Sequence, residues 1–109
     1  IGEVETAVRW GINAVILVNN NGSQNQETKI FDDAYGGEQR GKAHELWHFN
    51  QTNFTEIAKS MGAASIRVEK PNELGSAFDQ AFSMKGGPVI LDVVTDIEAL
   101  APGAYGPEG

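Results

Sequence analysis

The sequence predicts an α/β fold in which a parallel sheet carries helices on both faces. Three observations predict it: helical and strand patterns alternate along the chain, the strand patterns are β-favouring apolar runs, and Gly or Pro residues separate most segments. Strands that alternate with helices imply right-handed crossovers, which make the strands parallel. Ligands of such sheets gather at the carboxyl ends of the strands.

The first two elements are a helix and a strand. Residues 2–10 are expected to be helical because Val4 and Val8 lie one turn apart on one face. Gly11 is well placed to end this helix in a left-handed conformation. Residues 14–18, AVILV, form a continuous apolar run, which is typical of a strand buried on both faces.

A long polar segment follows this strand. Residues 19–51 show no convincing helix or strand period, and their apolar residues are isolated. We therefore predict a long loop, and loops of this length usually serve a function.

A second helix begins after Asn53. This residue is a favoured N-cap, and Glu56 stands where a capping box places its acidic partner. Apolar residues then recur at helical spacing up to Met61, before Gly62. Residues 65–69 alternate polar and apolar side chains and are predicted to form a strand.

The last two elements repeat the order of helix and strand. Residues 71–72, Pro-Asn, introduce a helical pattern that runs to Phe82 and ends at Gly-Gly. Residues 89–94, VILDVV, form the last predicted strand. We expect residues 1–100 to be one domain that lacks its amino-terminal side, because Ile1 is not a start residue, and 101–109 to be a tail or arm.

Composition argues against several classes of protein. The chain has 109 residues and a net charge of −7, which would repel a nucleic-acid backbone. No apolar run approaches the roughly 18 residues of a membrane span. The absence of cysteine excludes disulfides and thiolate zinc sites and fits a reducing compartment, so we expect a cytoplasmic protein without nucleic-acid or membrane partners.

The stretch VNNNGSQNQ, residues 18–26, is the main candidate site. A parallel strand delivers its last residues to a crevice, where Asn side chains offer neutral oxygens that can complete a Mg²⁺ shell. Gly22 lets the backbone turn. No carboxylate in this loop obviously completes the shell, and Asn and Gly runs also form ordinary turns, so the residues alone leave both interpretations open.

The runs GEVETAVRWGINAVILVNNNGS, NFTEIAKSMGAASIRVEKPNEL and GGPVILDVVTD carry a resemblance over most of the chain. They resemble the carboxyl-terminal, diphosphate-binding domain of thiamine diphosphate enzymes of the acetolactate synthase and pyruvate decarboxylase superfamily. The resemblance implies the thiamine diphosphate-binding fold, present only in part, because the Gly-Asp-Gly that opens the family's cofactor motif would precede Ile1.

Carried over by position, the resemblance implies roles for the residues of this stretch. Asn20 would bind Mg²⁺ through its side chain and Gly22 through its main-chain oxygen, with the Asp of Gly-Asp-Gly as the third protein ligand. The cofactor-binding residues would be Asn21, Gly22, Ser23 and Gln26. Substrate-facing positions would fall on Gln24 and Gln26.

The same resemblance implies the activity and its partners. The parent would be a thiamine diphosphate- and Mg²⁺-dependent lyase or transferase that decarboxylates or ligates a 2-oxo acid, as acetolactate synthase does. The activating glutamate would come from the pyrimidine-binding domain of a second subunit in a homodimer or homotetramer. These 109 residues would then contain no catalytic residue and be inactive alone. A non-catalytic or regulatory binding subunit with the same fold remains an alternative.

Residues 44–48, HELWH, match a second motif, H-E-x-x-H, in which two histidines on adjacent helical turns bind zinc. A zinc hydrolase is therefore another alternative. Against it, the segment lies in the polar loop, no long helix supports the histidines, and no further histidine can act as third ligand. We expect a solvated loop segment here.

Overall fold

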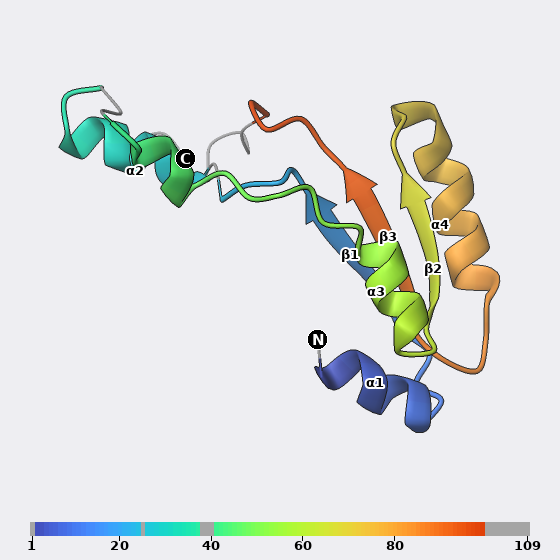
Figure 1. The fold of residues 1–109 in the computed structure, drawn as a ribbon. Coiled ribbons are helices and arrows are strands. Elements are labelled where there is room, and N and C mark those ends of the chain that lie inside the picture. Colours follow the sequence, from blue (N-terminus) through green and yellow to red (C-terminus); the bar gives the residue numbers. More distant parts are fainter. Residues whose placement is uncertain (1, 25, 38–40, 100–109) are drawn as a thin grey trace. The chain divides into compact units, whose positions relative to one another are not determined.

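The computed structural model of the chain describes residues 2–24, 26–37 and 41–99 (Figure 1). These residues form two compact units. The sheet unit contains the described residues up to Asn20 together with Gln51–Thr95. The loop unit contains those of Asn21–Asn50 and those that follow Thr95.

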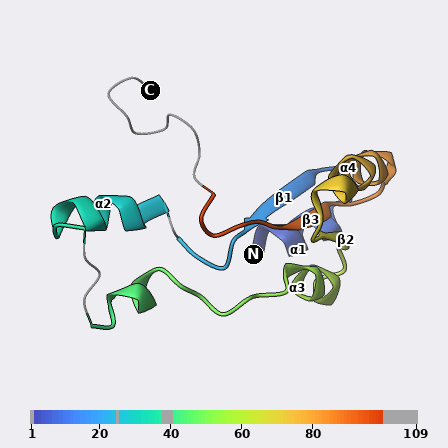
Figure 2. The ribbon, with the colours of Figure 1, turned by 90° about the horizontal axis from the view of Figure 1, so that it is seen from above.

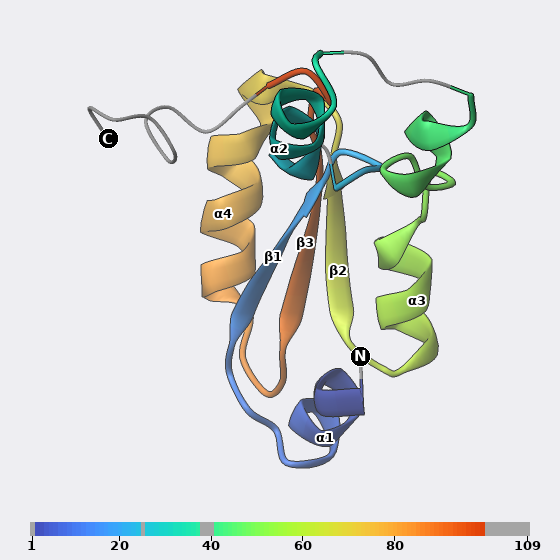
Figure 3. The same cartoon turned by 90° about the vertical axis from the view of Figure 1, so that its left-hand side faces the viewer.

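Three parallel strands form the centre of the sheet unit. They are β1 (Val15–Asn20), β2 (Ala64–Val68) and β3 (Val89–Val94), arranged in the order β1-β3-β2. Figure 3 shows β3 between its two neighbours. In register, Val89 lies opposite both Val15 and Ala64. The predicted parallel sheet is thus confirmed, with the last strand of the chain in the middle.

Helices cover both faces of this sheet, as predicted. Figure 2 shows α3 (Phe54–Ser60) and α4 (Leu74–Ser83) on opposite sides of the strands. On the α4 face, Val89 and Leu91 of β3 pack with the buried alanines of α4. On the α3 face, Ile90 packs with Ala58 and Ala63. Val4 and Val8 of α1 (Gly2–Arg9) pack against this second cluster.

The predicted helix boundaries follow from local chemistry. The Asn53 side chain accepts a hydrogen bond from the Glu56 amide at 3.2 Å, which confirms the predicted N-cap of α3. Gly11 follows α1 with a φ of 60°, so the left-handed end of that helix is also confirmed. A short 3-10 helix, Pro71–Glu73, leads into α4.

The burial predicted for the first strand is wrong. Ile16 and Leu17 of β1 keep 37% and 45% of their surface exposed. Within the part of the chain that the structure describes, β1 pairs only with β3 and forms an edge of the sheet. The strand that is buried on both faces is β3, in which Leu91 has no exposed surface.

The prediction of an irregular loop over residues 19–51 is also wrong in part. The loop unit contains the helix α2 (Gln26–Ala34) and a 3-10 helix, Ala43–Leu46. The rings of Phe31 and Tyr35, one turn apart, stack at 4.5 Å between centroids, and Trp47 meets Phe31 edge-on at 5.6 Å. These apolar residues pack locally with each other, so they show no long helical period.

The tail predicted for residues 101–109 lies outside the described residues. No helix within residues 2–24, 26–37 and 41–99 is long and apolar enough to cross a membrane.

Candidate functional site

The polar end of β1 belongs to the strand. Asn19 and Asn20 lie opposite Val93 and Val94 of β3 in the parallel ladder. The Asn20 carbonyl also accepts a hydrogen bond from the Thr95 amide at 3.0 Å. The expectation that the asparagines follow the strand is therefore wrong for the first two, because main-chain pairing continues for as long as β3 runs alongside.

The side chain of Asn20 is buried, with 4% of the residue exposed. Its Nδ2 donates to Asp92 Oδ1 at 2.8 Å and to the Thr52 carbonyl at 2.9 Å. Both partners are acceptors, so the nitrogen must lie on their side and Oδ1 must point the other way. Neither of these two hydrogen bonds uses the oxygen. Asn20 thus offers a fixed, neutral oxygen of the kind that binds hard cations.

Asp92 is a buried charged residue beside Asn20 that the sequence analysis did not single out. It lies in the middle of the apolar strand β3 and has no exposed surface. Its Oδ2 accepts hydrogen bonds from the Phe54 amide at 3.1 Å and from Arg67 Nη1 at 2.6 Å, while Oδ1 faces Asn20. A carboxylate within VILDVV is the signal that could have revealed it, because an acidic side chain is almost never fully buried without partners.

Arg67 lies beside Asp92 at the same level of the sheet. Arg67 is on β2 and lies opposite Asp92 of β3 in the parallel ladder. Its side chain keeps 24% of its surface exposed. Its Nε also donates to Glu69 Oε1 at 2.8 Å. The hydrogen bond to Glu69, and then the charge of Asp92, raise the pKa of the guanidinium, so Arg67 stays charged at all physiological pH values.

Asn21, Gly22 and Ser23 belong to the loop unit, whereas Asn20 belongs to the sheet unit. The structure brings Asn21 and Ser23 together in an Asx turn, in which the Ser23 amide donates to Asn21 Oδ1 at 2.9 Å. Gly22, between them, has a φ of 65°, a conformation that favours glycine. With its oxygen used inside the turn, the Asn21 amide group can offer its NH2 to a ligand.

Residues 47–49 hold this turn in place. The Gly22 carbonyl accepts from the Phe49 amide at 2.7 Å, and the Ser23 hydroxyl donates to the Trp47 carbonyl. Ser23 also forms an antiparallel bridge with His48. Both donors of Ser23 are thus engaged within the loop unit in this conformation.

The two glutamines differ in what the structure describes. The Gln24 amide donates to the Trp47 carbonyl at 2.9 Å, and the residue is exposed. Gln26 opens α2, and its side chain lies outside the described part of the chain. The substrate-facing role expected for both therefore stays a prediction.

The H-E-x-x-H segment does not form the α-helix that the zinc motif uses. Ala43–Leu46 is a 3-10 helix, and His48 lies beyond it in the bridge with Ser23. The side chain of His44 is not among those described. Within the described residues, no three His, Cys, Asp or Glu side chains gather as a metal site would need.

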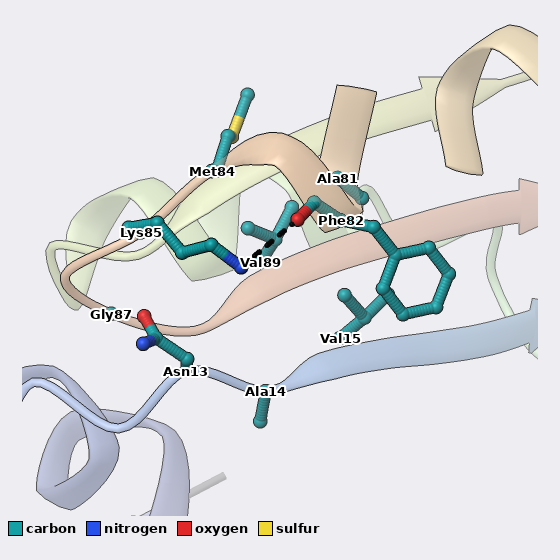
Figure 4. A pocket seen from close by; sticks show the side chains of 9 residues that line it. All are labelled: Asn13, Ala14, Val15, Ala81, Phe82, Met84, Lys85, Gly87 and Val89. Atoms are coloured by element: carbon teal, nitrogen blue, oxygen red, sulfur yellow. Dashed lines mark hydrogen bonds between the residues drawn. The ribbon is translucent and has the colours of Figure 1, made fainter. Parts of the chain in front are cut away.

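A small hollow lies where the strands begin, at the end of the sheet away from Asn20. Its volume is about 100 Å³. Figure 4 shows it beside the first residues of β1 and β3. Lys85 Nζ donates to the Phe82 carbonyl there at 3.2 Å, and Asn13 Oδ1 accepts from the Gly86 amide at 2.7 Å. The amino ends of the strands lie at this end of the sheet, whereas ligands of parallel sheets bind at the carboxyl ends. The polar end of β1 is therefore the better candidate site.

Comparison with known proteins gives consistent matches. Residues 1–93 match the family described as "Thiamine pyrophosphate enzyme, C-terminal TPP binding domain". The acetolactate synthase large subunit of Haemophilus influenzae is 32% identical over 97 residues, which cover 88% of this chain and 16% of that protein. The mitochondrial acetolactate synthase catalytic subunit of Saccharomyces cerevisiae is 33% identical over 96 residues, which cover 86% of this chain and 13% of that protein.

A relative with a different activity matches almost as well. The 2-hydroxyacyl-CoA lyase of Arabidopsis thaliana is 30% identical over 104 residues, which cover 86% of this chain and 16% of the lyase. The chain thus spans about one sixth or less of the length of these three relatives.

Proposed function

Because this chain belongs to the family of carboxyl-terminal TPP-binding domains of thiamine pyrophosphate enzymes, we propose that it forms the diphosphate- and Mg²⁺-binding part of an enzyme that acts on a 2-oxo acid. The reaction proposed is decarboxylation followed by ligation, as in acetolactate synthase. The similarity to two acetolactate synthases supports this reaction class.

One observation carries the assignment of the metal site. The Asn20 amide lies at the carboxyl end of a parallel strand, and its orientation is fixed by two acceptors, Asp92 Oδ1 and the Thr52 carbonyl. An amide held in this way presents its oxygen without having to lose rotational freedom on binding. The residue therefore fits a Mg²⁺ ligand, since Mg²⁺ demands oxygens in near-ideal geometry.

Gly22 supplies the second proposed ligand, through its main-chain oxygen. This oxygen already accepts from the Phe49 amide at 2.7 Å, but a carbonyl has two lone pairs and can bind a cation with the other. Asn20 and Gly22 together contribute two neutral oxygens. We propose that a carboxylate from another part of the parent protein completes the protein ligands, together with the diphosphate.

The turn formed by Asn21 and Ser23 is proposed to lie beside the diphosphate. Asn21 can donate through its NH2, because its oxygen is used in the turn. Ser23 would have to release the Trp47 carbonyl before its hydroxyl could donate to a phosphate oxygen. Gln26, at the start of α2, is proposed to face the substrate.

Bound thiamine diphosphate supplies an electron sink at the carbon from which a 2-oxo acid loses CO2. The residues of this chain are proposed to bind and orient the diphosphate end, and none of them is proposed as a catalytic residue. The pyrimidine-binding domain of a second subunit would supply the activating glutamate in a homodimer or homotetramer. We therefore propose that the 109 residues alone are inactive and that the parent works in the cytoplasm.

The test uses the full-length protein that carries this chain. We expect calorimetry to detect thiamine diphosphate binding only when Mg²⁺ is present, and we expect pyruvate to release CO2. Failure to bind the cofactor at saturating Mg²⁺ would refute the proposal. Binding without turnover of any 2-oxo acid would instead favour the non-catalytic binding subunit.

A second candidate reaction is the cleavage of a 2-hydroxyacyl-CoA. The similarity to the Arabidopsis thaliana lyase favours it, because the identity is close to that of the two synthases. Parallel assays with pyruvate and with a 2-hydroxyacyl-CoA distinguish the two reactions. A specificity constant at least tenfold higher for the thioester would identify the lyase.

A further inference from the structure

Asp92 lies on the face of β3 that looks toward α3. Side chains alternate along a strand, and Val89 and Leu91 pack in the cluster of the α4 face, whereas Ile90 packs in the opposite one. Asp92 follows on the side of Ile90, where it contacts Asn20 and the first turn of α3. A fully buried carboxylate is costly unless charges and hydrogen bonds compensate it, so its partners indicate its role.

The partners of Asp92 divide between its two oxygens. Oδ2 accepts from the Phe54 amide and from Arg67 Nη1, which fix the carboxylate plane and balance its charge. Oδ1 accepts from Asn20 Nδ2. One oxygen thus anchors the carboxylate to α3 and β2, and the other holds the amide at the end of β1.

The orientation of the Asn20 amide depends on this contact. Turning the amide over would bring its oxygen against Asp92 Oδ1 and the Thr52 carbonyl, so three acceptors would meet without a donor. The Thr52 carbonyl alone accepts only one of the two Nδ2 protons. The charged Asp92 forms the stronger of the two restraints, because hydrogen bonds to ionised groups exceed neutral ones.

We propose that Asp92 is a positioning residue that holds Asn20 Oδ1 toward the Mg²⁺ of the diphosphate site. The proposal rests on the metal site proposed above. Asp92 touches neither the metal nor the cofactor, and it acts through the Asn20 amide. Outer partners that orient a metal ligand typically change metal affinity about 10–100-fold when they are mutated.

Asp92→Asn in the full-length protein tests the proposal. The new amide can keep an oxygen toward Arg67 and the Phe54 amide only by turning its NH2 toward Asn20. Two NH2 groups then face each other, and the Asn20 amide must turn over and present nitrogen to the cation. We expect the Mg²⁺ concentration needed for half-maximal thiamine diphosphate binding, measured by calorimetry, to rise about 10–100-fold.

Leu91→Ala is the matched control. Leu91 is the neighbouring residue on β3, is fully buried, and packs on the opposite face, away from Asn20. Hydrogen exchange of β1 and β3 peptides shows whether both variants loosen the sheet. The Mg²⁺ requirement should change less than about threefold for Leu91→Ala, since the amide keeps both acceptors. An equal rise in both variants would mean that general loosening causes the effect and would overturn the proposal.

A double variant covers the case in which Asp92→Asn does not fold. Asn20→Asp with Asp92→Asn exchanges the two side chains, so one hydrogen bond across the pair is kept and a carboxylate oxygen faces the metal. We expect its Mg²⁺ requirement to stay within about tenfold of the wild type. A folded double variant with a requirement raised about 100-fold would refute the proposal.

Two results keep the proposals separate. A wild-type protein that does not bind thiamine diphosphate with Mg²⁺ refutes the proposed function itself. A wild type that binds both, together with a folded Asp92→Asn variant of unchanged Mg²⁺ requirement, refutes only the positioning role.

Discussion

Replacing Asn20 by Ala should loosen the sheet as well as weaken the metal site. The substitution removes one hydrogen bond to the ionised Asp92, worth about 1.5–3 kcal/mol, and one to the Thr52 carbonyl, worth about 0.5–1.5 kcal/mol. Asp92 is then left without this donor in a fully buried position, and the partly buried Thr52 carbonyl also loses its donor from Asn20. We expect the local free energy of opening to fall by about 2–4.5 kcal/mol in the absence of metal.

Asn19→Ala is the matched control, because it makes the same chemical change one residue earlier on the same strand. Asn19 is exposed, and its Oδ1 accepts from the Thr95 hydroxyl at 2.6 Å. An exposed acceptor is rehydrated when its partner is lost, so this variant should lose less than about 1 kcal/mol.

Hydrogen exchange by mass spectrometry of the full-length protein measures the difference without requiring global unfolding. Peptides that cover β1 and β3 report local opening. A loss of about 2–4.5 kcal/mol corresponds to opening that is about 30-fold to about 1,600-fold more frequent in Asn20→Ala, since about 1.4 kcal/mol is a factor of ten. If Asn20→Ala and Asn19→Ala exchange alike in metal-free buffer, the buried hydrogen bonds do not stabilise the sheet and the reasoning fails.

Three further predictions concern the helix ends and the metal. Gly62→Ala should lower the free energy of local opening, measured by hydrogen exchange, by about 1–2 kcal/mol, because φ is +85° and the new Cβ would lie 3.2 Å from Val8 Cγ1. The control Gly75→Ala, in open space on α4, should not lower it, and equal losses in both variants would contradict the strain argument. Asn53→Ala should lower the free energy of local opening of α3 by about 1 kcal/mol, because the Glu56 amide loses its acceptor. Asn53→Asp keeps an acceptor and should not lower it, and unchanged hydrogen exchange in the alanine variant would contradict a stabilising cap. A chelator should release thiamine diphosphate from the full-length protein on gel filtration, and added Mg²⁺ should restore binding; retention in excess chelator would contradict a metal-bridged diphosphate.

The parts of the fold that depend on residues close together in the sequence could be predicted from the sequence alone. The Asn53 cap and the strand of residues 89–94 involve local spacing and composition, and the structure has both. The helix α2 was missed because its Phe31 stacks on Tyr35, just beyond the helix, within the loop unit, so no apolar stripe extends along the segment.

The candidate site could be predicted only in part, for a different physical reason. The asparagine-rich end of the first strand could be found because it follows an apolar run, and the resemblance then implied a role for Asn20. The role of Asp92 depends on a partner 72 positions away, which only the pairing of β1 with β3 brings into contact. Likewise, the apolar run of β1 suggested burial on both faces, but burial depends on which strand lies in the centre of the sheet, and a single run carries no information on strand order.

The central position of β3 has a consequence for folding during translation. Among the described strands, β1 and β2 are made first but do not pair with each other, and each needs the strand of residues 89–94 as its neighbour. This part of the sheet therefore cannot assemble until nearly all of the 109 residues have been translated. During that interval β1 and β2 both lack their pairing with β3, and strand edges exposed during synthesis are prone to wrong association.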